Sequence, residues 1–93
     1  MSTFKAKILT PVGAVFEGNV TGVRMPGTLG SFEVKQNHAP IVSTLQSGDV
    51  AVHTETGDYL FTISGDYLFT ISGGVVEMVS NDLTLLADSV TID

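Results

Sequence analysis

Residues 75–87 read VVEMVSNDLTLLA, two short apolar runs on either side of a polar turn. The runs Val75–Val79 and Leu83–Ala87 have the usual length of a strand and are too short for a typical helix. The segment between them, 80–82, consists of Ser, Asn and Asp, which are typical of tight turns. This stretch therefore predicts a β-hairpin.

The rest of the chain is organised in the same way, as short runs rich in β-branched and aromatic residues. Residues 4–9 alternate with a period of two, as a half-buried strand does. Further strands are expected at Ala14–Glu17, Val20–Met25, Ser31–Val34, Ile41–Leu45 and Asp49–His53. Turns are expected at Pro11–Gly13 and Gly18–Asn19, and a loop at Pro26–Gly30.

Short strands at this spacing predict an all-β fold. No window of twelve residues carries a helical stripe. We expect an antiparallel β-sandwich or flattened barrel of about ten short strands. A chain of 93 residues supports one domain, so residues 1–93 are predicted to form a single unit.

An eight-residue segment, GDYLFTIS, occurs twice in succession at residues 57–64 and 65–72. Because strand side chains alternate with a period of two, exchanging one copy for the other keeps every side chain on its face. Both copies can therefore compete for one position in the sheet. We expect the second copy to occupy it, since it continues directly into Gly73-Gly74-Val75, and the first to lengthen the preceding connection. A strand-swapped homodimer, a self-assembling protein built on residues 57–72, is an alternative hypothesis.

Composition excludes several classes of function. The chain has 10 acidic and 4 basic residues, a net charge of −6 and no cysteine. All four basic residues lie in the first 35 positions, and residues 36–93 contain eight acidic residues and no Lys or Arg. Nucleic-acid binding needs clustered Lys and Arg, so it is not expected. The absence of cysteine excludes disulfides and thiolate metal sites. No apolar stretch reaches the roughly 20 residues that a bilayer requires, so direct membrane insertion is not expected either.

The sequence offers little for catalysis. His38 and His53 lie 15 positions apart without further ligands at zinc-site spacing, and no phosphate-binding glycine motif is present. Asp82 and Asp88 could form a carboxylate pair, but their positions in a turn and at a strand end favour structural roles. We therefore expect no enzyme, no cofactor and no metal. A small hydrolase using His38 and a carboxylate is kept as the weakest alternative.

A set of ordered motifs carries a resemblance to a known family. The segments are Pro11–Gly18, Met25–Phe32, Asn37–Ile41, Leu45–Gly48, Ile71–Met78 and Asn81–Asp88. Asn-His-Ala-Pro at 37–40 and Ser-Gly-Gly at 72–74 carry most of the weight. In this order and at this spacing the segments closely resemble the epsilon subunits of F-type ATP synthases. The resemblance covers nearly the whole chain apart from one octamer copy.

The resemblance implies a β-sandwich of about ten strands in the rotor of the enzyme. Such a subunit is non-catalytic, packs against the gamma subunit and the c-ring, and couples c-ring rotation to the catalytic head. It is a peripheral protein that reaches the cytoplasmic face of the inner (plasma) membrane through the ATP synthase complex, here expected to be that of a bacterium. Family members usually continue into a C-terminal helical hairpin. Since the sequence stops at Asp93, no such hairpin is expected here.

The resemblance also implies a contact with the c-ring in the Gly27–His38 region. The corresponding residues are Gly30, Ser31, Phe32 and Glu33. Ser31 stands where the family often has an acidic residue, Glu33 where it usually has glycine, and Gln36 where proline is common. A change from glycine to glutamate adds bulk, charge and a restriction on φ.

The contact with gamma is implied at two further positions. Thr10 and His38 match residues near the gamma interface in the family. His38 is equally well explained as a loop residue that bonds to nearby backbone.

Overall fold

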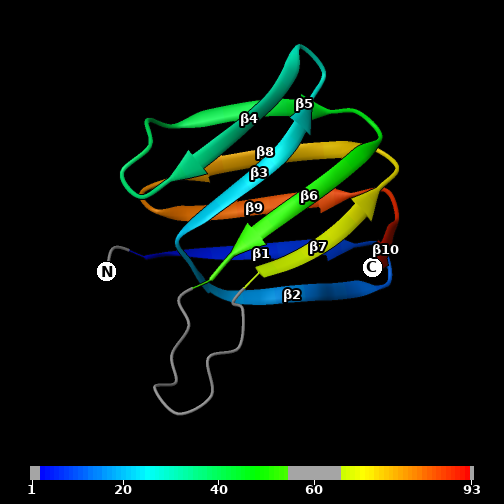
Figure 1. Cartoon of the computed structure of the whole chain (residues 1–93), viewed down its shortest axis with the longest axis horizontal. Coiled ribbons are helices and arrows are strands. Elements are labelled where there is room, and N and C mark those ends of the chain that lie inside the picture. Colours follow the sequence, from blue (N-terminus) through cyan, green and yellow to red (C-terminus); the bar gives the residue numbers. More distant parts are fainter. Residues whose placement is uncertain (1–2, 55–65, 93) are drawn as a thin grey trace.

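The structure, a computed structural model, describes residues 3–54 and 66–92. Within those ranges the chain forms ten strands (Figure 1). They are β1 (Phe4–Thr10), β2 (Gly13–Val20), β3 (Gly22–Gly27), β4 (Gly30–Lys35), β5 (Ile41–Leu45), β6 (Gly48–His53), β7 (Asp66–Ile71), β8 (Gly74–Val79), β9 (Asp82–Ala87) and β10 (Val90–Ile92). The all-β fold class predicted from the sequence is confirmed.

The strands form two packed layers. They follow the hydrogen-bonded path β10-β7-β6-β3-β5-β8-β9-β1-β2, and β4 pairs with β3 off this path. Strands β3 and β5 are joined by a single register pair, Gly27 and Leu45, and the sheet bends there from one layer into the other. The result is a β6 layer (β4, β3, β6, β7 and β10) facing a β9 layer (β5, β8, β9, β1 and β2) (Figure 1).

One strand pair departs from the predicted antiparallel arrangement. β1 pairs antiparallel with β2, to which a short turn joins it, but parallel with β9. A tight hairpin can join only antiparallel neighbours, whereas parallel neighbours need a long connection. Strands β2 to β8 lie between β1 and β9 in the sequence, and this connection is long enough to allow the parallel pairing.

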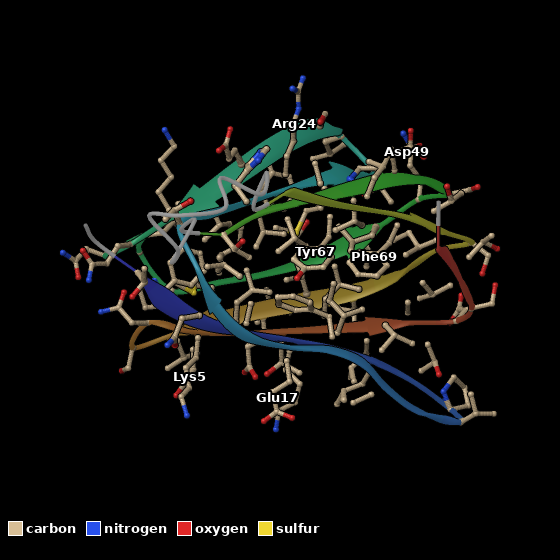
Figure 2. The ribbon with its side chains drawn as sticks, turned by 60° about the horizontal axis from the view of Figure 1, so that its bottom comes forward. Lys5, Glu17, Arg24, Asp49, Tyr67 and Phe69 are labelled. Atoms are coloured by element: carbon tan, nitrogen blue, oxygen red, sulfur yellow. The ribbon has the colours of Figure 1, made fainter. Side chains whose placement is uncertain are left out.

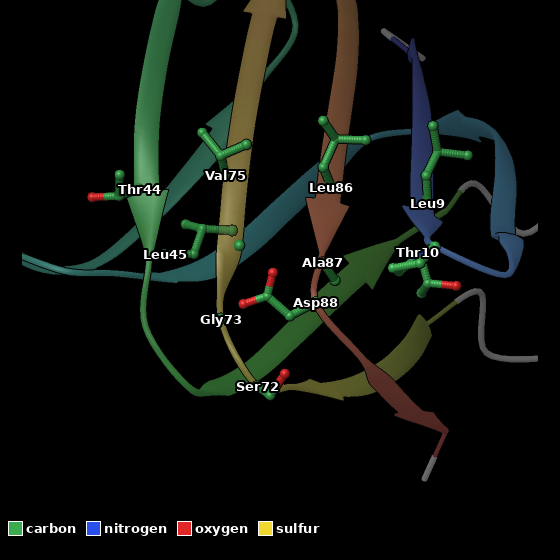
Figure 3. Close-up of a pocket in the computed structure, with 12 residues that line it drawn as sticks. Leu9, Thr10, Thr44, Leu45, Ser72, Gly73, Val75, Leu86, Ala87 and Asp88 are labelled. Carbon is green, nitrogen blue, oxygen red and sulfur yellow. The ribbon is translucent and has the colours of Figure 1, made fainter.

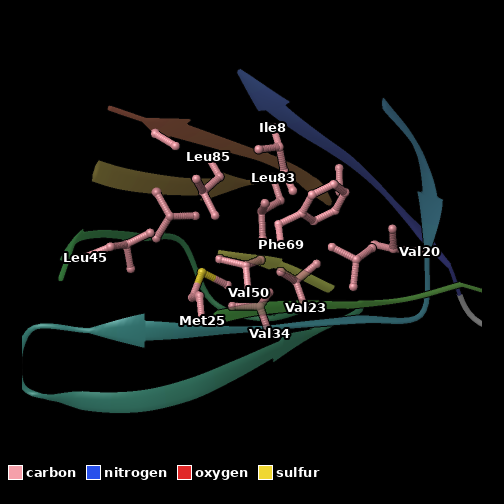
Figure 4. Packing of buried hydrophobic residues seen from close by; sticks show 14 of the residues in the cluster. Ile8, Val20, Val23, Met25, Val34, Leu45, Val50, Phe69, Leu83 and Leu85 are labelled. Carbon is pink, nitrogen blue, oxygen red and sulfur yellow. The ribbon is translucent and has the colours of Figure 1, made fainter. Parts of the chain in front are cut away.

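Alternation along the strands builds the core. Side chains of one parity point between the layers, and Ile8, Val50 and Leu85 are fully buried there (Figure 4). The opposite parity points outward: Lys5 and Glu17 project from the β9 layer, and Arg24 and Asp49 from the β6 layer (Figure 2). The buried cluster consists of Phe4, Ala6, Ile8, Val20, Val23, Met25, Val34, Leu45, Val50, Val52, Phe69, Ile71, Val76, Met78, Leu83, Leu85 and Ala87.

Aromatic rings pack between the layers where edge strand β2 faces β7. The ring centroid of Phe16 lies 5.4 Å from that of Tyr67 and 6.2 Å from that of Phe69. Tyr67 and Phe69 stack nearly parallel at 6.4 Å, and both lie between the two layers (Figure 2). Such contacts add to the apolar burial of the rings and hold the two layers together.

The second octamer copy occupies the sheet, as predicted. β7 pairs with β6 over six residues, from Asp66 with His53 to Ile71 with Gly48. Its last three residues also pair with β10, a strand that the sequence did not reveal. The predicted role of the first copy, residues 57–64, falls outside the described residues.

The predicted turn at Gly18–Asn19 is wrong. Gly18 and Asn19 lie inside β2 and pair with Ala6 and Lys5. The chain leaves β2 instead at Thr21, whose N–H and hydroxyl both donate to the carbonyl of His53, at 2.7 and 3.0 Å. An edge strand bonds on one side only and so tolerates glycine more readily than a central strand.

The predicted Pro26–Gly30 loop is a tight hairpin. Pro26 pairs with Ser31 and Gly27 with Gly30, which leaves only Thr28 and Leu29 as the turn. The carbonyl of Pro26 still accepts a hydrogen bond from the N–H of Gln46 at 2.8 Å. Proline is tolerated in a strand where its missing N–H is not required.

Candidate partner-binding surface

Three apolar side chains lie in a row across the outward face of the β9 layer. Register places Leu9 beside Leu86, Leu86 beside Val75, and Val75 beside Thr44. The apolar row consists of Leu9, Leu86 and Val75, which lie side by side on β1, β9 and β8, and Thr44 lies next to Val75 on β5 (Figure 3). Leu86 is 48% exposed although it sits in the middle of a sheet. An apolar row on an outward face is typical of a surface that another protein covers.

The row comes from apolar pairs at consecutive positions. In β9, Leu85 points inward and is fully buried, while its neighbour Leu86 points outward. Ile8 and Leu9 in β1 divide in the same way, with Ile8 fully buried and Leu9 half-buried. A strand with one solvated face needs only every second residue to be apolar. Such pairs are therefore the sequence signal for this surface, which the expected strand positions alone do not reveal.

A hollow of about 750 Å³ adjoins the row. Leu9, Val75 and Leu86 line it together with Thr10 and Asp88 (Figure 3). The Thr10 hydroxyl donates to the Gly13 carbonyl at 3.1 Å and accepts from the N–H of Val12 at 3.2 Å, which holds the β1–β2 turn. An apolar hollow rimmed by hydroxyls and one carboxylate suits the side chains of a partner protein.

The other half of the same outward face is polar. In the strand register, Lys5 on β1 lies beside Asp82 on β9, and Lys7 lies beside Thr84. The Lys7 ammonium lies 3.8 Å from the Glu17 carboxylate. An exposed pair of this kind contributes at most about 1 kcal/mol to stability. The β9 layer thus presents an apolar half near Thr10 and a charged half near its other end.

The β3–β4 hairpin projects a second apolar group. Leu29 is fully exposed at the tip, and the hydroxyls of Thr28 and Thr44 lie 2.9 Å apart. Gly27 makes the tight turn possible, because a Cβ there would lie 2.6 Å from the Gly30 carbonyl and 2.8 Å from the Phe32 ring. The tip is therefore held close to the end of the β9 layer.

The four residues of the predicted c-ring contact divide between two faces. Gly30 lies at the start of β4, and Ser31 and Glu33 are exposed. The ring of Phe32 is half-buried and packs against the core. Because side chains alternate along β4, the Phe32 ring points toward the core while Ser31 and Glu33 point outward. Phe32 therefore stabilises the hairpin by packing against the core.

Glu33 lies over a glycine on the neighbouring strand. Its register partner is Arg24, and a Cβ built at Gly22 would meet the Glu33 carboxylate oxygen at 2.9 Å. Arg24 Nε donates a long hydrogen bond, 3.5 Å, to the Ser31 hydroxyl. The space beside Gly22 therefore accommodates the bulk that a glutamate adds at this position.

Thr10 and His38 are not brought together at one point. Thr10 ends β1, whereas the loop of His38 is bonded to the turn that precedes β9, beside the beginning of β1. The seven residues of β1 separate the two ends by about 20 Å at the rise of an extended strand. His38 is exposed, its Nδ1 lies 2.8 Å from the Ala39 carbonyl, and its N–H donates to the Lys35 carbonyl at 3.2 Å.

The arrangement gives no support to the hydrolase alternative. Asp82 begins β9 and Asp88 follows its last residue, so about 20 Å separates them and they cannot act as a pair. The hollow that contains Asp88 is not lined by His38. Residues 3–54 and 66–92 contain no group of three His, Asp or Glu side chains that could hold a metal ion. They also contain no helix long and apolar enough to cross a membrane.

The chain is similar to known proteins over nearly its whole length. Residues 3–92 match the family described as ATP synthase, delta/epsilon chain, beta-sandwich domain. The chain is 38% identical over 84 residues to the ATP synthase epsilon chain of Salinibacter ruber, covering 89% of this chain and 56% of that one. It is 35% identical over 90 residues to the epsilon chain of Xylella fastidiosa, covering 96% of this chain and 59% of that one. It thus spans a little over half the length of these curated relatives.

Solved structures show the same fold. One is the Euglena gracilis mitochondrial ATP synthase assembly of OSCP, F1 and c-ring, with a TM-score of 0.84 at 15% identity over 99% of this chain and 54% of the matched chain. Another is the central stalk and c-ring of the Tetrahymena thermophila enzyme, with a TM-score of 0.74 at 15% identity over 95% and 65%. At this identity these likenesses show the fold alone. The match over residues 3–92, together with epsilon chains as relatives, shows that this chain belongs to the ATP synthase delta/epsilon-chain β-sandwich family.

Proposed function

We propose that this chain is a non-catalytic central-stalk subunit of a proton-translocating F-type ATP synthase. In this role it couples rotation of the c-ring to the catalytic head through contacts with the gamma subunit and the c-ring. The observation that carries the proposal is the apolar row, in which neighbouring strands place apolar side chains next to one another on the outward face of the β9 layer.

Gamma is the proposed partner of the apolar row. Thr10 lines the hollow beside the row, and the His38 loop is bonded to the turn at the other end of the same layer. A partner lying along the outward face of the β9 layer would therefore contact both positions. Burying Leu86 and its neighbours against such a partner contributes about 25 cal/mol per Å² of apolar surface removed from water, before the costs of association.

The c-ring is the proposed partner of the hairpin tip. Leu29, Gly30 and Ser31 are exposed there, next to Thr44 at the end of the β9 layer. Leu29 would supply the apolar contact, and Ser31 a polar one. The chain would then be peripheral to the cytoplasmic face of the inner membrane and attached only through its partners. The relatives named above are bacterial, which supports a bacterial enzyme.

Co-expression with gamma, followed by purification, tests the proposal. The chain is expected to co-purify with gamma at equal stoichiometry. A version lacking residues 57–64 is the matched control. Failure of both versions to bind gamma would contradict the proposal, whereas binding by the shortened version alone would show that the duplication abolishes the function.

A second candidate function is strand-exchanging self-assembly. The observation in its favour is that residues 65–72 contribute β7 and recur identically at 57–64, so one chain carries two candidates for one position in the sheet. Light scattering across concentration tests this function. A dimer that disappears on deletion of residues 57–64 would support it, and a strict monomer at high concentration would contradict it.

A further inference from the structure

Two asparagines from distant parts of the chain bind each other at the His38 end of the β9 layer. The N–H of Asn37 donates to the side-chain oxygen of Asn81 at 2.8 Å. The side-chain amide of Asn81 donates back to the side-chain oxygen of Asn37 at 3.1 Å. Asn37 belongs to the loop between β4 and β5, and Asn81 to the turn between β8 and β9. The paired hydrogen bonds therefore tie the His38 loop to a hairpin turn 44 residues away.

The backbone at both positions suits this pairing. Asn37 has a φ of 64°, Ser80 of 50° and Asn81 of 63°. Two consecutive positive φ values at residues 80 and 81 are those of a type I′ turn. Asparagine is the residue other than glycine that adopts this conformation most readily, and unlike glycine it brings a donor and an acceptor.

The tie continues into neighbouring elements. The carbonyl of Asn81 accepts a hydrogen bond from the N–H of Lys5 at 3.1 Å, which fixes the turn against β1. The side chain of Gln36 donates to the Thr3 carbonyl at 3.1 Å. The residues just before His38 are thus held by the start of β1 and by the β8–β9 turn.

We propose that Asn81 is a positioning residue for a partner contact made by the His38 loop. The inference rests on the proposed function, because that function supplies the partner. His38 is exposed, and its described hydrogen bonds go to the backbone carbonyls of Lys35, at the end of β4, and Ala39, so its position depends on that of the nearby backbone. Ordering a loop on binding costs conformational entropy, and a loop that is already ordered avoids this cost. Asn81 would therefore strengthen binding without touching the partner.

Glycine variants remove the hydrogen bonds between Asn37 and Asn81 without changing the backbone conformation of the β8–β9 turn. Asn81→Gly keeps the positive φ and deletes the amide, and Asn37→Gly does the same in the loop. Asp49→Ala is the control, because Asp49 is exposed on the outward face of the β6 layer and its side chain also accepts a hydrogen bond, from the Thr70 hydroxyl at 3.1 Å. In the free chain, amide exchange at Asn37 should become about tenfold faster in Asn81→Gly, because its N–H loses its acceptor, while exchange at Leu85 in the core stays unchanged. A role in global stability alone would raise both rates together.

Binding to co-expressed gamma provides the functional measurement. Asn81→Gly should weaken the Kd for gamma by about three- to tenfold, a change that corresponds to part of the ordering cost of a short loop. The double variant should be no weaker than either single variant, since both remove the same tie. Asp49→Ala should bind as the wild type does.

The outcomes separate this inference from the proposed function. Faster exchange at Asn37 with weaker gamma binding supports the positioning role. Unchanged exchange at Asn37, or an unchanged Kd in a chain that does bind gamma, overturns the positioning role alone. Failure of the wild-type chain to bind gamma overturns the proposed function and the positioning role with it.

Discussion

At the scale of single residues, neighbouring leucines in β9 serve different purposes. Leu85 is fully buried in the core, whereas Leu86 is 48% exposed in the apolar row. A strand that only had to cover a core would be expected to carry a polar residue at position 86. The second leucine is therefore best explained by a partner.

Truncation should distinguish the two leucines. We expect Leu85→Ala to lower the free energy of unfolding by about 2–5 kcal/mol, because it leaves a cavity between the layers. Leu86→Ala should cost less than about 1 kcal/mol, since its side chain is already half in water. Urea denaturation of both variants measures the difference. Equal costs would contradict the assignment of the two side chains to opposite faces.

Gly27 should tolerate no side chain. Gly27→Ala would place its Cβ 2.6 Å from the Gly30 carbonyl, so the hairpin must shift. We expect a loss of about 1–3 kcal/mol in the free energy of unfolding, the usual cost of overpacking. Gly18→Ala is the control, since its nearest contact would be an ordinary 3.7 Å to the Phe16 ring. Thermal denaturation that ranks Gly18→Ala as the more damaging variant would refute this reasoning.

At the scale of strands, the sequence predicts the positions of the strands better than it predicts the candidate partner-binding surface. Alternation predicted the strand around Ile8, and the Ser-Asn-Asp turn between two short apolar runs predicted the hairpin that contains Leu85. The sequence pattern missed β10, because a strand of three residues is too short to show the alternation of buried and exposed side chains. The pattern predicted a loop at Pro26–Gly30 rather than a tight turn at Thr28 and Leu29, because the close approach of Gly27 to Phe32 is set by the other strand of the hairpin.

The candidate site was less predictable, again for physical reasons. The resemblance indicated Thr10 and His38, but only the strand register shows that they lie at opposite ends of one layer. The tie between Asn37 and Asn81 joins residues 44 positions apart, and no local pattern reveals such a contact. Contacts of this kind depend on the completed fold.

The sequence of strand β7 is present twice in the chain, because residues 57–64 repeat residues 65–72. Deleting residues 57–64 leaves the β7 sequence and all its pairings intact, so the shortened chain should keep its far-UV circular dichroism spectrum and its Tm within a few degrees. Deleting residues 65–72 produces the same polypeptide, so a single variant suffices. Loss of the β spectrum would show that the first copy is required for folding.

Phe69 tests whether the two copies can replace each other. In the shortened chain, Phe69→Ala should cost about 3–5 kcal/mol, because the ring is almost fully buried. In the full chain the cost should be smaller, since Phe61 stands at the equivalent position of an intact copy and the octamer period preserves the face. Urea denaturation of both proteins checks this, and equal costs would show that the copies do not exchange.

At the scale of the whole molecule, the two outward faces differ. The β9 layer carries the apolar row and the hollow beside it, and the β3–β4 tip lies near the same end (Figures 1 and 3). The β6 layer also exposes a leucine, Leu68, which is 44% exposed beside Ala51. The proposed role requires that gamma recognise the row specifically rather than any exposed apolar side chain.

Binding of gamma to a charged variant of the row tests this requirement most directly. Isothermal titration should give the wild-type chain and Leu68→Asp the same Kd for gamma. Leu86→Asp should bind at least about tenfold more weakly, because it places an unpaired charge in the apolar contact, while the chain stays folded with a Tm lowered by no more than about 8 °C. Wild-type affinity in Leu86→Asp would contradict the assignment of the apolar row as the gamma-binding surface.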